Sequence, residues 1–329
     1  MKIYQDRHAD SSFLNGKVVA ILGYGSQGSA QAKCLRDSGV SVIVGARPGG
    51  NSFRIAEDDR MEAMPIGEAA RRADIICMLL SDMAQKEIYE KEVAPHLKEG
   101  QALYFSHGFN IAFGLITPPK NIDVIMIAPK ATGGRLREAY LREEGVPALV
   151  SIHQDHTGNA KKTVLALARA LRLTKRGVIE CTFQQETCAN LFAEQAVDLG
   201  GALEVVKAGF DTMVARGIPP EVAYFECVGV TRMILDMLER DGLKKITYGI
   251  SDTACYGSLT RGERVVDEHV RRQMDDVFSE IEGGKFAAEW LEEYSKGGKR
   301  FEALKRKASS HQLEKVGEKM RKIFKGESL

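Results

Sequence analysis

The sequence predicts an α/β protein, in which a Rossmann-type, doubly wound parallel sheet is followed by an all-helical domain. Short apolar runs alternate with segments of helical length through the first half, as in chains built from βαβ units. A glycine-rich turn, GYGSQG at 23–28, lies between the first run and a helical segment. After residue 183 the apolar spacing is helical throughout. We therefore expect a dinucleotide-binding domain over 1–182 and a helical domain over 183–329.

Seven apolar runs are the expected strands of the sheet. In chain order they cover 17–22, 40–44, 73–80, 102–106, 123–128, 148–152 and 177–183. Most are continuous rather than alternating, which is typical of strands covered by helices on both faces. The expected helices of the second domain cover 186–209, 220–241, 264–283, 287–296 and 304–324.

Composition excludes several classes of protein. The 46 Lys and Arg residues nearly balance 45 Asp and Glu, whereas nucleic-acid and membrane-surface proteins usually have a basic excess. No run approaches the ~18 apolar residues of a membrane helix, and the polar start has no signal-peptide core. The six cysteines form no C-x-x-C pair. We expect a cytoplasmic protein that binds neither nucleic acid nor a membrane.

The glycine-rich turn is the expected phosphate loop of a dinucleotide site. Its glycines, Gly23, Gly25 and Gly28, let the backbone approach a pyrophosphate at the N-terminus of the following helix. The acidic residue that binds the ribose of NAD is missing after the second run, where Arg47 and then Ser52 occur instead. Because arginine can pair with a 2′-phosphate, these residues favour NADPH over NADH.

Two candidate reacting groups directly follow strands. His107 comes after the run at 102–106, and Lys130 comes after the run at 123–128. Ligands of open α/β sheets bind at such carboxyl ends, although either residue alone is more often structural. In the helical half, Glu186, Asn190 and Glu194 follow at i, i+4 and i+8, and Glu226 and Val230 form a second i, i+4 pair. Carboxylates on helices can hold divalent cations, but this spacing is also typical of a solvated helix face.

Taken together, these residues resemble ketol-acid reductoisomerase in its short form, over essentially the whole chain. The resemblance rests on GYGSQG (23–28), LRDSGV (35–40), HGFNI (107–111), APK (128–130), LFAEQ (191–195), PPE-AYFEC (219–227) and SDTA-YG (251–257). That family reduces and rearranges acetohydroxy acids with NADPH and two Mg²⁺ ions. The resemblance implies a Rossmann domain, a knotted helical domain, and a homodimer or higher homo-oligomer that shares its active sites.

The resemblance also implies roles for individual residues. Besides the three glycines, the residues implied to bind NADPH are Tyr24, Ser26, Gln27, Arg47, Ser52, Asp82, Met83, Ala84, Gln85 and Gly133. His107 matches the active-site histidine, Lys130 a lysine near the metals, Glu186 an acid behind the metal ligands, and Ser251 a substrate-binding serine. Glu194 and Glu226 match two of the four metal-binding carboxylates.

The other metal-binding positions depart from the family pattern. Asn190 stands where the family has an aspartate that bridges both ions, and Val230 stands where it has a glutamate. A further family glutamate is replaced by Cys255, which we interpret as a small packed residue rather than a nucleophile or a soft-metal ligand. Hard cations need anionic oxygen ligands, so we expect one weakly bound Mg²⁺ or none.

The sequence therefore predicts an NADPH-dependent reductase on this scaffold that has lost the isomerase step. Its substrate would be a ketone or an imine, in the form of a small amino- or keto-acid-like metabolite of a specialised pathway. Lys130 or His107 would donate the proton, and Glu194 and Glu226 would bind a remaining metal or a substrate amine. The alternatives are a working ketol-acid reductoisomerase with an unusual metal site and a non-catalytic NADPH-binding protein.

Overall fold

The structure is a computed structural model that describes residues 1–324. It divides into two compact units, of which the first is Met1–Ala189 and the second begins at Asn190. The break falls within one helix, so the domain boundary predicted between residues 182 and 183 remains a proposal. None of the helices in the described residues is both long enough and apolar enough to cross a membrane.

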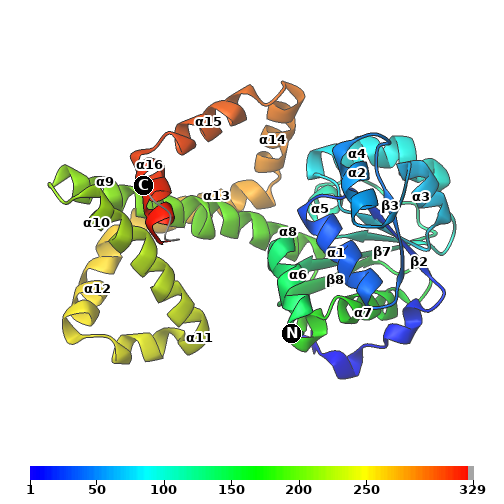
Figure 1. The fold of residues 1–329 in the computed structure, drawn as a ribbon, viewed down its shortest axis with the longest axis horizontal. Coiled ribbons are helices and arrows are strands. Elements are labelled where there is room, and N and C mark those ends of the chain that lie inside the picture. Colours follow the sequence, from blue (N-terminus) through cyan, green and yellow to red (C-terminus); the bar gives the residue numbers. More distant parts are fainter. Residues whose placement is uncertain (325–329) are drawn as a thin grey trace. The chain divides into compact units, whose positions relative to one another are not determined.

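The first unit is built on a mixed sheet (Figure 1). Its nine described strands have the order β1-β9-β8-β7-β6-β5-β2-β3-β4. Their bounds are β1 Ile3–Tyr4, β2 Val18–Leu22, β3 Ser41–Gly45, β4 Glu62–Met64, β5 Ile75–Met78, β6 Ala102–Phe105, β7 Asp123–Pro129, β8 Ala148–Gln154 and β9 Val178–Glu180. All neighbours from β4 to β7 are parallel, which confirms the predicted Rossmann-type core.

The sheet is not parallel throughout, which differs from the prediction. β8 pairs antiparallel with β7, and Ala148 at its start lies opposite Pro129 at the end of β7. β1 also pairs antiparallel with β9 at the edge of the sheet. An apolar run shows that a strand forms but not which way it runs, because the direction depends on the connection before it.

Helices cover both faces of this sheet. They are α1 Ser26–Asp37, α2 Asn51–Asp58, α3 Ile66–Arg72, α4 Asp82–Ile88, α5 Phe109–Ala112, α6 Gly133–Leu141, α7 Ala160–Ala170 and the start of α8 Phe183–Phe192. Two separate buried clusters result: Leu35, Leu136 and Leu167 belong to one, and Ala69 and Ile111 belong to the other. This two-sided burial is the reason why the strands are continuously apolar.

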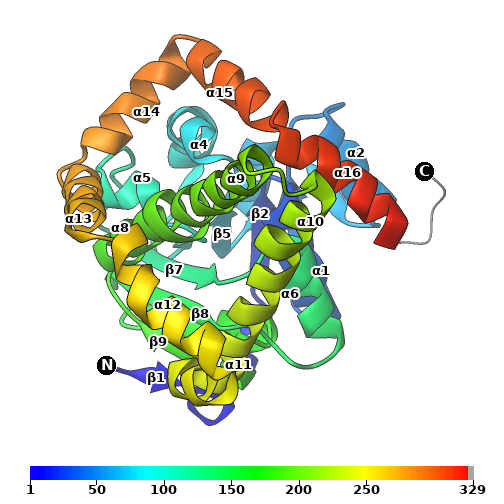
Figure 2. The ribbon, with the colours of Figure 1, turned by 90° about the vertical axis from the view of Figure 1, so that its left-hand side faces the viewer.

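The second unit is helical, as predicted. Figure 2 shows its helices in chain order from α9 in green to α16 in red. They are α9 Gly200–Ala215, α10 Pro220–Tyr224, α11 Thr231–Gly249, α12 Asp252–Val265, α13 Glu268–Glu282, α14 Lys285–Ser295, α15 Lys299–Ser309 and α16 Gln312–Phe324.

Several helix boundaries in this unit differ from the predicted ones. π-helical segments at Ala193–Asp198 and Phe225–Val230 interrupt what the apolar spacing predicts as single helices. The predicted helix over 304–324 is two helices, α15 and α16, and α12 was not predicted as a helix. Hydrophobic spacing alone does not mark a π segment or a short break, because the same face of the helix continues beyond it.

Candidate active site

His107 and Lys130 lie at the carboxyl ends of neighbouring parallel strands. β6 ends two residues before His107, β7 ends immediately before Lys130, and Phe105 pairs with Met126 across the two strands. The structure brings the two side chains together on a third residue, Glu186 of α8. His107 Nδ1 lies 3.1 Å from Glu186 Oε2, and Lys130 Nζ donates to Glu186 Oε1 at 2.9 Å.

The carboxylate of Glu186 is buried and has several hydrogen-bond donors. Its side chain is 0% exposed, and Oε2 also accepts a hydrogen bond from the backbone N–H of Gly108 at 3.1 Å. Burial raises the pKa of Glu186, but the hydrogen bond and charge of His107, followed by those of Lys130, outweigh burial and hold the pKa below its usual range. The ionised carboxylate therefore holds the proton of His107 on Nδ1.

Close packing of α8 against the loop after β6 explains how Glu186 reaches these partners. A Cβ atom on Gly108 would lie 2.3 Å from Thr187 Oγ1 and 2.9 Å from the carbonyl oxygen of Phe183, so only glycine fits there. Sequence reasoning missed the N–H of Gly108 as a ligand of Glu186. The HGFNI motif was the available signal, since a glycine directly after a candidate reacting group indicates a close approach.

The phosphate loop, residues 23–28, has the predicted position between β2 and α1. A Cβ atom on Gly28 would lie 2.1 Å from the carbonyl oxygen of Gly23, so glycine is needed for the tight turn. A Cβ atom on Gly25 would meet nothing within 4 Å, so the loop is open at this point. Ser26, Gln27 and Gly28 form the first turn of α1, where backbone N–H groups lack partners within the helix. This arrangement suits a pyrophosphate.

The loop after Lys130 packs directly on the phosphate loop. Gln27 Nε2 donates to the carbonyl oxygen of Ala131 at 2.8 Å, and a Cβ atom on Gly133 would lie 2.0 Å from the carbonyl oxygen of Ser26. Gly133 begins α6, so the N-termini of α1 and α6 meet at the predicted pyrophosphate site. Two helix N-termini at one point favour the binding of an anion.

Replacing Gly133 with alanine is expected to weaken NADPH binding. The clash with Ser26 costs about 1–3 kcal/mol of overpacking strain, and relieving it moves the phosphate loop. We expect an affinity loss of about tenfold, which corresponds to ~1.4 kcal/mol, in a fluorescence titration with NADPH. Gly134→Ala is the matched control because a Cβ atom there meets nothing within 4 Å. Equal affinities for the two variants would contradict this interpretation.

The other predicted cofactor residues fall into two groups. Arg47 is exposed after β3 and Ser52 lies in the first turn of α2, so both remain suitable for contact with a ligand. Asp82, Met83 and Ala84 begin α4 after β5, and the Asp82 carboxylate accepts a hydrogen bond from Gln85 Nε2 at 3.4 Å. The side chains of Tyr24 and Gln85 instead bind within the protein. Gln85 donates to the carbonyl oxygen of Leu80 at 3.0 Å and accepts from Asn110 at 3.2 Å, while the Tyr24 hydroxyl donates to Asp59.

The predicted metal-site residues of the second unit do not supply the ligand atoms that two hard cations need. Asn190 Nδ2 donates to Glu194 Oε1 at 3.0 Å, so the amide directs an N–H group at the carboxylate. Val230 has no lone pair, and Glu226 is exposed in the π-helical segment Phe225–Val230. Divalent cations need several oxygen ligands, anionic ones above all. The two-Mg²⁺ site that the family implies therefore does not fit the residues present.

Ser251 has a structural role within its own unit. It is the N-cap of α12, and its Oγ accepts a hydrogen bond from the backbone N–H of Ala254 at 3.3 Å. N-cap hydroxyls satisfy donors at the start of a helix. The predicted role of Ser251 in substrate binding remains a prediction.

Comparison with known proteins gives consistent results across the whole chain. Residues 13–177 match the family described as acetohydroxy acid isomeroreductase, NADPH-binding domain, and residues 183–326 match ketol-acid reductoisomerase, C-terminal domain. The chain is 49% identical over 325 residues to a ketol-acid reductoisomerase (NADP(+)) of Pyrobaculum aerophilum, with 99% of each chain covered. A protein of the same description from Pyrococcus abyssi is 46% identical, with 98% of this chain and 97% of the relative covered.

A solved structure has the same fold. It is that of an NADH-preferring ketol-acid reductoisomerase from an uncultured archean, with a TM-score of 0.94 and 44% identity. The superposition covers 98% of this chain and 99% of the other. Together with the NADPH-binding domain match, these relatives establish an NADP-dependent oxidoreductase with a Rossmann-type domain and a helical domain. The chain therefore belongs to the ketol-acid reductoisomerase family, in its short form with one helical domain.

Proposed function

We propose that this protein is an NADPH-dependent reductase of a ketone or an imine, in which the isomerase step of the family has been lost. The substrate is a small amino- or keto-acid-like metabolite of a specialised pathway. The observation that carries this proposal is the pair of replaced ligands, because Asn190 donates a hydrogen bond to Glu194 and Val230 cannot bind a cation. In contrast, His107, Lys130 and Glu186 are all present, and Glu186 contacts both of the other two.

The two half-reactions of the family make different demands on a site. An alkyl migration needs an ionised substrate alkoxide that two metal ions polarise as Lewis acids. Reduction needs a carbonyl or imine carbon beside the nicotinamide and a group that neutralises the developing negative charge. Replacing two metal-binding carboxylates directly impairs the alkyl migration. The reduction can proceed with protein side chains alone as the neutralising groups.

His107, Lys130 and Glu186 have the arrangement that a reduction requires. When bound, NADPH supplies the hydride that is added to the C=O or C=N carbon. The resulting alkoxide or amide anion takes a proton from the ammonium group of Lys130, so that the alcohol or amine and NADP⁺ are formed. The ionised Glu186 holds Lys130 and His107 in place and offsets the positive charge of Lys130 between turnovers. His107 is the second candidate for the proton donor.

A working ketol-acid reductoisomerase is the second candidate function. It is favoured by the relatives, which carry that description at 46–49% identity over nearly their whole length. In this case Glu194, Glu226 and water would have to hold enough Mg²⁺ for the migration. The descriptions of these relatives support a working ketol-acid reductoisomerase more strongly than a reductase. The side chains of Asn190 and Val230, which are poor metal ligands, support the reductase.

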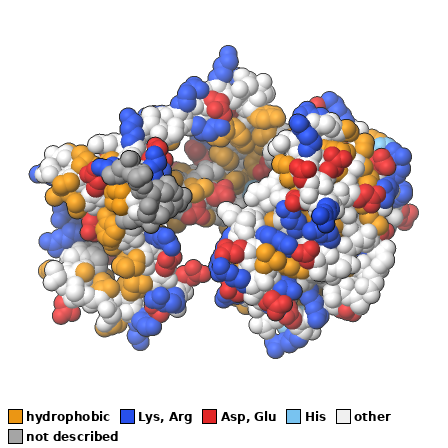
Figure 3. All heavy atoms as spheres, in the orientation of Figure 1, with side chains coloured by type: hydrophobic (Ala, Val, Ile, Leu, Met, Phe, Trp, Pro, Cys, Tyr) orange, Lys and Arg blue, Asp and Glu red, His pale blue; other side chains and the backbone are white. Residues whose placement is uncertain are grey.

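The cofactor contacts and the oligomeric state belong to the same proposal. Arg47 and Ser52 bind the 2′-phosphate, and Asp82–Ala84 and Gly133 contact the rest of NADPH. Glu194 and Glu226 bind a single cation, either a substrate amine or one Mg²⁺ that the reduction does not require. A homodimer is supported by an apolar groove of about 790 Å³ in the second unit, lined by Val205, Val206, Met213, Leu235, Met274 and others. The left part of Figure 3, which holds this unit, has orange hydrophobic side chains on its surface. No disulfide joins the six cysteines, all of which lie within the described residues, and this is consistent with the cytoplasm.

The proposal is tested by NADPH oxidation in the presence of EDTA. The substrate panel contains 3-hydroxy-3-methyl-2-oxobutanoate, which is the product expected from the alkyl shift of 2-acetolactate, together with other 2-oxo acids and cyclic imines. We expect at least one of these compounds to be reduced at a rate that Mg²⁺ does not change. Reduction that requires Mg²⁺, or NADPH binding without reduction of any compound in the panel, would contradict the proposal.

A further inference from the structure

A hydrogen bond inside the first unit joins two segments of the cofactor site that lie far apart in the sequence. Tyr24 lies between two glycines of the phosphate loop, and its side chain is only 3% exposed. Its hydroxyl group donates to Asp59 Oδ2 at 3.0 Å. Asp59 directly follows α2, the helix that begins at the segment containing Arg47 and Ser52. The phosphate loop is thus bound to the far end of the proposed 2′-phosphate segment.

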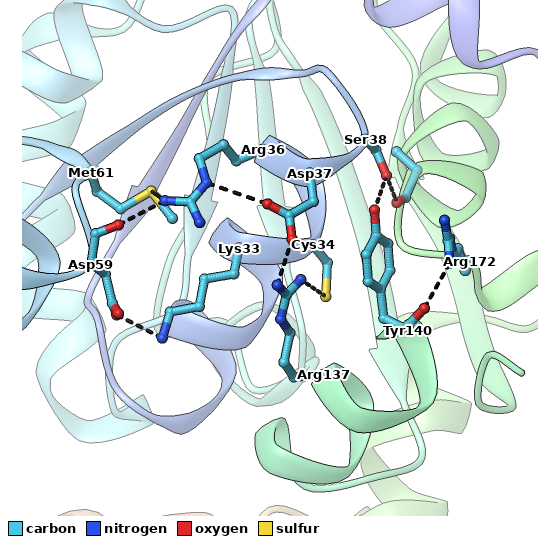
Figure 4. A network of polar contacts seen from close by, with 11 residues as sticks. Lys33, Cys34, Arg36, Asp37, Ser38, Asp59, Met61, Arg137, Tyr140 and Arg172 are labelled. Carbon is cyan, nitrogen blue, oxygen red and sulfur yellow. Dashed lines mark hydrogen bonds and ion pairs between the residues drawn. The ribbon is translucent and has the colours of Figure 1, made fainter. Parts of the chain in front are cut away.

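Asp59 has two further contacts with side chains of α1. Lys33 Nζ of α1 lies 2.7 Å from Oδ2, and each side chain of this pair is 28% exposed (Figure 4). Arg36 Nη1 donates to the carbonyl oxygen of Asp59 at 2.7 Å. Burial raises the pKa of Asp59, but the hydrogen bonds from Lys33 and Tyr24 outweigh burial and lower it. Asp59 is therefore an ionised acceptor between α1, α2 and the phosphate loop.

This position matters because of the shape of NADPH. The pyrophosphate and the 2′-phosphate are covalently joined, so a protein that binds both must hold two anion sites at a fixed separation. NADH has no 2′-phosphate and is insensitive to that separation. α2 has only eight residues, so a displacement at Asp59 is transmitted to its first turn, where Ser52 lies.

We propose that Tyr24 and Asp59 are positioning residues that set the preference for NADPH over NADH. Their hydrogen bond fixes the distance between the phosphate loop and the segment of Arg47 and Ser52. The inference rests on the proposed role of these two residues in binding the 2′-phosphate. Tyr24 acts here through its buried hydroxyl group, while its backbone remains part of the phosphate loop.

The test compares the affinities of the full-length protein for NADPH and NADH by fluorescence titration, which needs no substrate. Tyr24→Phe keeps the buried ring and removes the hydroxyl group, and Asp59→Asn keeps the shape and removes the charge. In either variant we expect the ratio of NADPH to NADH affinity to fall about two- to tenfold, the range that one net hydrogen bond supplies. In the double variant the two effects should not add, because Tyr24→Phe removes the bond that Asp59→Asn weakens.

Tyr140→Phe is the matched control. Tyr140 is also 3% exposed, and its hydroxyl group bonds to Ser38 Oγ at 2.7 Å, away from α2 (Figure 4). Its loss should lower Tm much as Tyr24→Phe does and leave the affinity ratio unchanged. A general structural effect would change the ratio equally in both variants and would overturn the inference.

Arg47→Ala separates this inference from the proposal on which it rests. A fall of the affinity ratio in Arg47→Ala, without a fall in Tyr24→Phe or Asp59→Asn, would overturn the positioning role and leave the 2′-phosphate site intact. An unchanged ratio in Arg47→Ala would overturn the assignment of that site, and the positioning role with it. A fall in all three variants, but not in Tyr140→Phe, is the expected result.

Discussion

Replacing Lys130 with methionine is expected to lower kcat/KM for NADPH-dependent reduction by about 10²- to 10⁴-fold, the usual contribution of a positioned general acid. Lys130 Nζ is fixed by Glu186 at 2.9 Å and lies at the end of β7, beside His107. Methionine has a similar length but can neither donate a proton nor neutralise the developing anion. Steady-state NADPH oxidation with a substrate accepted from the panel measures the effect.

Two further variants give this prediction its controls. Lys120→Met makes the same substitution at an exposed position of the first unit and should retain normal activity. Glu186→Gln keeps the shape of the buried side chain but removes the charge that orients Lys130 and His107, so its effect should not add to that of Lys130→Met. If Lys130→Met kept more than half of the wild-type kcat/KM, Lys130 would not be the proton donor and His107 would be preferred.

Restoring both lost carboxylates is expected to produce a metal site. The variant Asn190→Asp/Val230→Glu removes the N–H group that Asn190 directs at Glu194 and places a second carboxylate there. It also adds a carboxylate at position 230, where valine offers no ligand atom. We expect the affinity for Mg²⁺ in calorimetric titration to rise by more than about 10-fold, the lower end of what even outer-shell changes at metal sites produce. The variant should also begin to convert 2-acetolactate.

The control for this gain is Asn190→Asp/Val230→Gln, which differs from the restored variant only in one charge. It should bind Mg²⁺ more weakly, because an amide oxygen is a poorer ligand for a hard cation than a carboxylate. Equal and tight binding of two ions by the unaltered protein and by both variants would show that Asn190 and Val230 do not limit the metal site.

Much of the fold could be predicted from local sequence. β2, β3, β5, β6 and β7 were predicted because each is an apolar run long enough to be recognised. β1 and β4 were missed because they have only two or three residues and no longer apolar run surrounds them. The antiparallel direction of β8 depends on the path of the chain between strands, which no run of residues encodes.

The candidate site could be predicted only where it depends on neighbouring strands. His107 and Lys130 were each expected at the carboxyl end of a strand of one sheet, where ligands of open α/β sheets bind. Their joint contact with Glu186 could not be predicted, since it depends on how α8 packs against Gly108, some 78 positions away in the sequence. The bond from Tyr24 to Asp59 is hidden for the same reason, because 35 positions separate the two residues. A glycine motif indicates backbone contact with a cofactor but not where the tyrosine side chain within it lies.

The central claim, that reduction survives without the isomerase step, is tested most directly by identifying the product formed from 2-acetolactate with NADPH and Mg²⁺. Binding of NADPH, measured in the same preparation, shows that the protein is folded. The account predicts that no 2,3-dihydroxy-3-methylbutanoate is formed, while a substrate that needs no migration is reduced even in EDTA. Mg²⁺-dependent formation of the dihydroxy acid from 2-acetolactate would contradict the account and establish a working ketol-acid reductoisomerase.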